Sequence, residues 1–172
     1  MTHTQLLQLV DYYADLEIRV QRLMKQACRP VCASCLKICC RPEMCRESLE
    51  SPFLVLAKER GETKPTWSEE RGLLGPKGCA LSVGRPPVCY EFLCQAILEN
   101  QPNQAARLKL KDLAMVLTRA GQRALGSDHI VEIMTMERLA QVKPPRLAAH
   151  FALAEAELIE FESFWSQPSR SR

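Results

Sequence analysis

The chain has 172 residues, of which 47% are hydrophobic and 25% are charged, and its formal net charge is +3. These values suit one globular domain with its own core, exclude extensive disorder, and give little support for nucleic acid as a partner. No stretch approaches the roughly 18 consecutive apolar residues of a membrane span, and the first residues lack a signal-peptide pattern, so we expect a cytoplasmic protein without membrane contact.

A long amphipathic helix is predicted at the start of the chain, because apolar residues recur at intervals of three and four from Leu6 to Ala27. A short helix is expected at 52–60, with Ser51 as its N-terminal cap. A second short helix is expected at 87–99. No segment alternates convincingly with a period of two, so the sequence predicts no substantial sheet.

The last part of the chain, 102–165, is predicted to form helical hairpins. One apolar seam runs from Ala106 to Ala124, and its helix is expected to end at Gly126. A helix of about four turns is predicted from Ile130 to Leu139. After two prolines that interrupt the chain, a final seam runs from Leu147 to Trp165.

Together these elements predict a mainly α fold, an antiparallel helical bundle with a loop-rich, cysteine-rich metal-binding insert. We expect a single domain over 1–172. Its parts are a scaffold helix (1–27), a cysteine-cluster region (28–95), helical hairpins (102–165) and a frayed tail (166–172). The seams are interpreted as bundle core, and the alternative is docking of a protein partner or a second copy.

The nine cysteines all lie between Cys28 and Cys94, in the part of the chain that also carries most glycines and prolines. An odd count without an export signal disfavours disulfides. Buried small hydrophobic residues are a second alternative, but they do not explain why all nine gather in one loop-rich stretch. Thiolates separated by two or three residues can converge on one ion, so the spacing favours metal binding.

The cysteines form two arms, one at 28–45 and one at 79–94. The expected metal ligands come from both arms: Cys32, Cys35, Cys39, Cys40, Cys45, Cys79, Cys89 and Cys94, with Cys28 as the weakest candidate. All-sulfur ligation suits zinc or iron, including an iron–sulfur cluster, and argues against calcium or magnesium. Adjacent Cys39 and Cys40 point in different directions, so both need not bind the same ion. Either the region binds two ions, or only one of these two cysteines is a ligand. Basic residues outnumber acidic ones between Lys25 and Arg46. This excess either favours thiolates or forms a solvated basic face or a weak phosphate-binding patch.

Catalytic motifs do not emerge from the sequence, which has no recognisable Ser/His/Asp set and no glycine-rich phosphate loop. The spacing of Cys28, Cys32 and Cys35 matches that of radical SAM enzymes, but the strand–helix alternation of those enzymes is missing. His129 and His150 are expected at the surface or the edge of the core. A redox or electron-transfer role and a zinc-stabilised adaptor are the alternatives to simple chelation.

Two arms of the cysteine region resemble a known family. Cys32-x2-Cys35-x3-Cys39-Cys40, the Gly78–Leu81 element and the Arg85–Cys94 segment are similar to the bacterial cysteine-cluster proteins of the YkgJ type, named for a CxxCxxCC motif. The resemblance covers about residues 28–95 and implies a zinc- or iron-chelating domain of no settled activity.

This chain departs from the family pattern in two places. One extra residue precedes the Cys39-Cys40 pair, and a Cys-Pro that the family often has before the glycine–cysteine element is missing at Arg71–Gly75. We expect Cys45 or Cys28 to supply the missing ligand. Arg85 is expected beside the thiolates, as a group that hydrogen-bonds near them.

Overall fold

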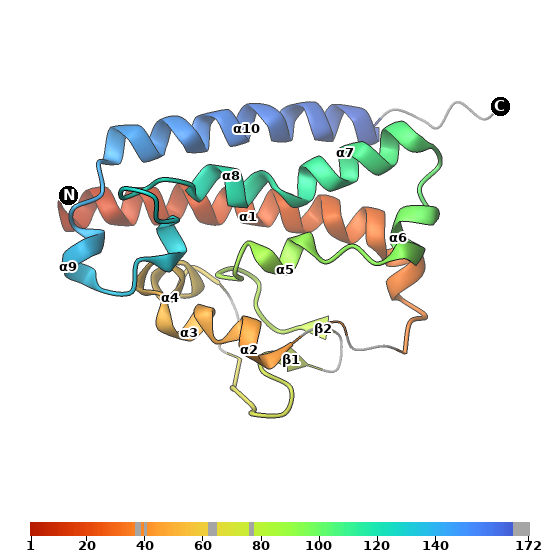
Figure 1. Ribbon diagram of the computed structural model, residues 1–172, viewed down its shortest axis with the longest axis horizontal. Helices are drawn as coiled ribbons and strands as arrows, with labels where there is room; N and C mark the ends of the chain where they lie inside the picture. Colours follow the sequence, from red (N-terminus) through yellow and green to blue (C-terminus); the bar gives the residue numbers. More distant parts are fainter. Residues whose placement is uncertain (37–38, 40, 62–64, 76–77, 167–172) are drawn as a thin grey trace.

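The computed structural model describes residues 1–36, 39, 41–61, 65–75 and 78–166. Over this part the chain is mainly helical, as predicted, and the expected tail lies outside the described residues except for Ser166 (Figure 1). The elements in chain order are α1 (His3–Cys32), α2 (Pro42–Cys45), α3 (Glu47–Glu50), α4 (Pro52–Lys58), β1 (Leu74–Gly75), β2 (Gly78–Cys79), α5 (Val88–Glu91), α6 (Gln95–Glu99), α7 (Gln104–Ala114), α8 (Val116–Gly121), the 3-10 turn η1 (Ile130–Glu132), α9 (Met136–Leu139) and α10 (Pro144–Ser166).

Helix α1 is longer than the predicted scaffold helix. It begins with a capping box, in which the Thr2 hydroxyl accepts a hydrogen bond from the Gln5 backbone and the Gln5 side chain accepts one from Thr2. It continues past Pro30 and ends at Cys32, because a proline in the last turn removes only one backbone hydrogen bond. Cys28 therefore lies on the scaffold helix itself, one turn before Cys32.

The bundle consists of α1, α10 and the α7–α8 pair (Figure 1). Helices α1 and α10 lie side by side and run in the same direction, since Tyr12 hydrogen-bonds Glu155 at 2.6 Å and Arg19 pairs with Glu162 at 2.9 Å. The α7–α8 pair runs opposite to both, so the predicted antiparallel packing holds for this pair but not between α1 and α10. Residues 122–143, with η1 and α9 among them, join α8 to α10 in place of the expected tight links. No helix in the described ranges is both long enough and apolar enough to cross a membrane.

The apolar seams form the core of this bundle, which confirms their interpretation. On α1, every seam residue from Leu6 to Ala27 is buried, and α10 buries its seam from Leu147 to Phe161. The aromatic rings of Tyr13 and Phe151 meet at 5.8 Å between centroids. Docking of a protein partner or a second copy stays a prediction, and it would have to use other faces of these helices.

Two helices predicted in the last part of the chain are replaced by shorter elements. The helix expected from Ala106 to Ala124 is interrupted at Met115 and ends at Gly121, before the predicted Gly126. The four-turn helix predicted from Ile130 to Leu139 is wrong: η1 and the single turn α9 take its place. The reason is that the backbone of Ile133 is extended and buries this side chain completely between the two turns.

The short helices of the middle region follow the prediction in part. The Ser51 hydroxyl caps α4 by accepting a hydrogen bond from the Leu54 backbone, as expected. The helix predicted at 87–99 is divided into α5 and α6, because the backbone of Phe92 leaves the helical conformation. The two strands of two residues each fit the expectation of no substantial sheet.

The cysteine region has a small hydrophobic core of its own. Cys45, Leu73 and Leu81 are each only 2% exposed, and Trp67 and Cys79 pack against them. The antiparallel β1–β2 pair places Leu74 opposite Cys79. Together with α2 and α3, this pair lies on the side of α1 away from α10, and α4, which contacts both α3 and α1, is nearer to the bundle (Figure 1). The predicted insert is therefore a packed substructure held against the bundle.

Candidate metal centre

Four cysteines from four separate segments line one cavity of about 180 Å³: Cys39, Cys45, Cys79 and Cys89. One comes from the segment after α1, and the others come from the ends of α2 and β2 and from α5. The rest of the wall is largely apolar, formed by Met44, Leu74, Leu81, Pro86 and Phe92, with Arg41, Ser48 and Arg85 as its polar members. The two arms that the sequence analysis singled out thus meet at this cavity.

A second group of cysteines lies at the C-terminal end of α1. Burial raises the pKa of the Cys28 thiol to about 11, and the nearby Cys32 and Cys94 add to the rise. The pKa of Cys32 is also raised, first by burial and then by Cys94, Cys39 and Cys35. Cys39 therefore lies between the two groups, because it also lines the cavity.

The predicted ligands are thus divided between two places. In the part of the chain that the structure describes, no three His, Cys, Asp or Glu side chains stand close enough to hold one metal ion together. Cys40 lies outside the described residues. That Cys32, Cys35 and Cys94 are ligands stays a prediction, and these three residues are exposed at the end of the scaffold helix rather than in the cavity wall.

Arg85 lies beside the cavity cysteines, as predicted. Its Nε and Nη2 donate hydrogen bonds to the Leu81 carbonyl at 3.1 and 2.7 Å, and its guanidinium carbon is 6.0 Å from the centroid of the Tyr90 ring. Burial acts to lower the pKa of Arg85, but Tyr90, Cys79, Glu17 and Cys89 together raise it above its ordinary value. The positive charge of Arg85 therefore interacts electrostatically with two of the four cavity cysteines.

Glu17 is a structural residue of this site that the sequence pattern does not mark. It is completely buried, and its carboxylate accepts hydrogen bonds from the Gly84 and Arg85 backbones and from the Tyr90 hydroxyl at 2.7 to 2.9 Å. Burial raises the pKa of Glu17, while these hydrogen bonds oppose the rise. The signal was its position one turn after Tyr13 on the apolar face of α1. Through Glu17, the scaffold helix holds the segment that carries Arg85 and its neighbouring cysteine.

Ser48 is a second residue that the sequence does not mark. It lies on α3, is completely buried and lines the cysteine cavity. Its hydroxyl oxygen finds no hydrogen-bond partner among the described residues. A buried hydroxyl without a hydrogen-bond partner destabilises the folded protein. A group bound in the cavity could accept a hydrogen bond from the Ser48 hydroxyl and remove this cost.

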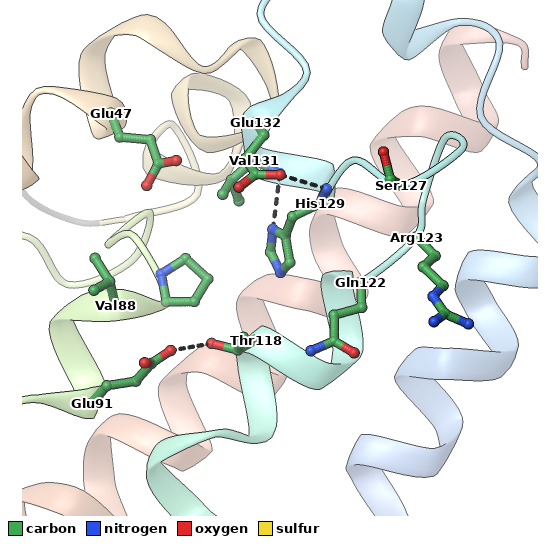
Figure 2. Close-up of a pocket in the computed structure, with 11 residues that line it drawn as sticks. Glu47, Val88, Glu91, Thr118, Gln122, Arg123, Ser127, His129, Val131 and Glu132 are labelled. Carbon is green, nitrogen blue, oxygen red and sulfur yellow. Dashed lines mark hydrogen bonds between the residues drawn. The ribbon is translucent and has the colours of Figure 1, made fainter.

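A larger pocket of about 500 Å³ lies between α3, α5, α8 and η1 (Figure 2). It carries the carboxylates of Glu47, Glu91 and Glu132, and the imidazole of His129. The His129 Nδ1 accepts a hydrogen bond from the Val131 backbone at 3.2 Å, and its Nε2 lies 3.4 Å from the Leu117 carbonyl. Burial lowers the pKa of His129. The ring is therefore a neutral structural cap at the edge of the core, as the sequence analysis expected.

The half-buried Glu47 is predicted to make stability depend on pH. Burial, and secondarily Glu132, raise its pKa from the ordinary 4.5 to about 7. Because the folded state then holds the proton more tightly, Glu47 lowers the free energy of unfolding as pH rises from about 4.5 to 7. Replacing Glu47→Gln should therefore stabilise the protein by about 1 kcal/mol at pH 8, a value reduced by solvent screening, and should change little at pH 4.

Urea unfolding of both proteins at pH 4 and pH 8 measures this difference. The matched control is Glu50→Gln, an exposed glutamate on the same helix, which should show the same small effect at both pH values. An equal effect of Glu47→Gln at pH 4 and pH 8 would contradict the prediction.

No family model, curated protein or solved structure matches this chain. The chemistry of the cysteine cavity is therefore inferred from its residues and their arrangement.

Proposed function

We propose that this protein binds a metal, zinc or iron, through the cysteines of the cavity. The observation that carries the proposal is that four cysteines from four segments line one cavity: Cys39, Cys45, Cys79 and Cys89. Thiolates are the ligands that zinc and iron–sulfur clusters prefer in proteins. The same four residues belong to the two arms whose spacing is typical of a metal site.

The surroundings of the cavity fit a negatively charged metal–thiolate group. Arg85 lines the same cavity and interacts electrostatically with Cys79 and Cys89, and its positive charge would offset the negative charge that four thiolates leave on such a site. Apart from the cysteines the wall is largely apolar, and the Ser48 hydroxyl has no hydrogen-bond partner among the described residues. Zinc would supply a crosslink at this place, and iron would supply a crosslink and one-electron redox chemistry.

Metal binding at this cavity would also stabilise the cysteine region. The four side chains come from α2, β2, α5 and the segment after α1, and two of them, Cys45 and Cys79, belong to the small core of the cysteine region. Because the unfolded chain does not hold these thiolates together, the free energy of binding becomes free energy of folding. A reducing compartment such as the cytoplasm, where we place the protein, keeps the thiols available.

Purification without air, followed by measurement of zinc and iron per chain, tests the proposal. We expect Cys79→Ser and Cys89→Ser each to lower the retained metal at least about tenfold and to lower the melting temperature. A chelator should lower the melting temperature of the unchanged protein in the same way. The matched control is Cys94→Ser, an exposed cysteine outside the cavity wall, which should leave the metal of the cavity bound.

The outcomes separate the two groups of cysteines. Loss of metal in Cys94→Ser but not in Cys79→Ser would place the site at the end of α1 instead of in the cavity. A folded protein that retains no zinc or iron when purified without air would overturn the proposal altogether.

A further inference from the structure

The cavity that the four cysteines line is larger than a single zinc site needs. Four thiolates bound to one zinc at about 2.3 Å stand only about 3.8 Å apart, and no space is left between them. The volume here is about 180 Å³, roughly six times the ~30 Å³ that one water molecule occupies in the liquid. Space of this kind suits a group that has several atoms between its protein ligands.

The wall of the cavity offers the environment that such a group uses. Iron–sulfur clusters carry inorganic sulfides, which accept hydrogen bonds, and their reduction potentials depend on those bonds and on exclusion of water. Apart from the four cysteines, most of the lining residues are leucine, proline, methionine or phenylalanine. The Ser48 hydroxyl is buried in that wall and has no hydrogen-bond partner among the described residues.

We infer that the cavity takes an iron–sulfur cluster, held by Cys39, Cys45, Cys79 and Cys89, and that the Ser48 hydroxyl donates a hydrogen bond to one of its sulfur atoms. The inference rests on the proposed metal-binding function and narrows it to one class of cofactor. Ser48 would be a positioning residue that adjusts the reduction potential of the cluster, since its hydroxyl acts through the sulfur atom that it contacts. Bound in this way, the hydroxyl would stabilise the more negative, reduced form of the cluster.

Parallel loading of the full chain with zinc alone, and with iron and sulfide without air, tests the cofactor class. We expect the second treatment to give a brown protein with iron and acid-labile sulfide in near-equal amounts, both lost in Cys79→Ser and Cys89→Ser. Zinc bound in place of iron, and lost in the same two variants, would overturn the inference and leave the metal-binding function standing. Retention of neither zinc nor iron would overturn both the iron–sulfur inference and the proposed metal-binding function.

The role of Ser48 is tested by Ser48→Ala in the loaded protein. We expect its midpoint potential to shift to a more negative value, while iron and sulfide contents stay unchanged. The matched control is Ser82→Ala, since the Ser82 hydroxyl is also buried without a partner among the described residues but does not line the cavity. In the metal-free protein, removal of either hydroxyl should leave the melting temperature unchanged or raise it. Equal potentials for Ser48→Ala and the unchanged protein would overturn the role of Ser48.

Discussion

Replacing Glu17→Ala is expected to lower the free energy of unfolding by about 3–5 kcal/mol. The carboxylate is completely buried and accepts hydrogen bonds from the Gly84 backbone, the Arg85 backbone and the Tyr90 hydroxyl. Its removal leaves three donors without their acceptor, and each buried donor so left costs about 1–3 kcal/mol. It also removes a negative charge from the neighbourhood of the Arg85 guanidinium.

Urea unfolding at pH 7 measures this effect, and Glu50→Ala is its control, because Glu50 is an exposed glutamate of the cysteine region. The control should change the free energy of unfolding by less than about 0.5 kcal/mol. A loss below about 1 kcal/mol in Glu17→Ala would show that the segment carrying Arg85 is held by other contacts. We further expect Glu17→Ala to weaken metal retention, since α1 would no longer hold the segment that contains Cys89.

Replacing Gly121→Ala is expected to destabilise the protein by about 2–3 kcal/mol, although alanine is ordinarily the better residue in a helix. Gly121 is the last residue of α8, and a Cβ atom there would collide with Cε1 and Nε2 of the His129 ring. The ring cannot move aside cheaply, because its nitrogens are engaged by the Val131 backbone and the Leu117 carbonyl. The glycine is therefore required by the close approach of the histidine.

A double-mutant cycle with His129→Ala isolates this collision. In the His129→Ala background, Gly121→Ala should cost nothing or should stabilise, which gives a coupling of about 2 kcal/mol between the two sites. Thermal and urea unfolding of the four proteins measure it. The same loss from Gly121→Ala with and without the histidine ring would contradict the explanation.

Most of the fold was predictable where hydrophobic periodicity is sustained. The seams of α1 and α10 run over five or more turns, so a small error at any one residue does not change the prediction. The prediction was wrong between Ile130 and Leu139. The apolar residues there are few, and their spacing is compatible both with one helix and with two separate turns. There the burial of Ile133 in an extended conformation decided the structure.

The candidate site was predictable to a similar extent. The cysteine types and spacings marked both arms, and Arg85 was expected beside them. Glu17 was hidden because a carboxylate on an apolar face is ordinarily a residue at the edge of the seam, and only its three donors explain its burial. Ser48 was hidden because nothing in the local sequence distinguishes it from an exposed serine.

By itself, the sequence determined the mainly helical class, the residues of the bundle core, the cap of α4 by Ser51 and the concentration of thiols between Cys28 and Cys94. These depend on local spacing and composition, which are properties of neighbouring residues. Only the tertiary structure decided which cysteines share a cavity, which lie at the end of α1, and which buried groups face them. The reason is that Cys39, Cys45, Cys79 and Cys89 come from four segments of the chain, and no local pattern describes how these segments pack with one another.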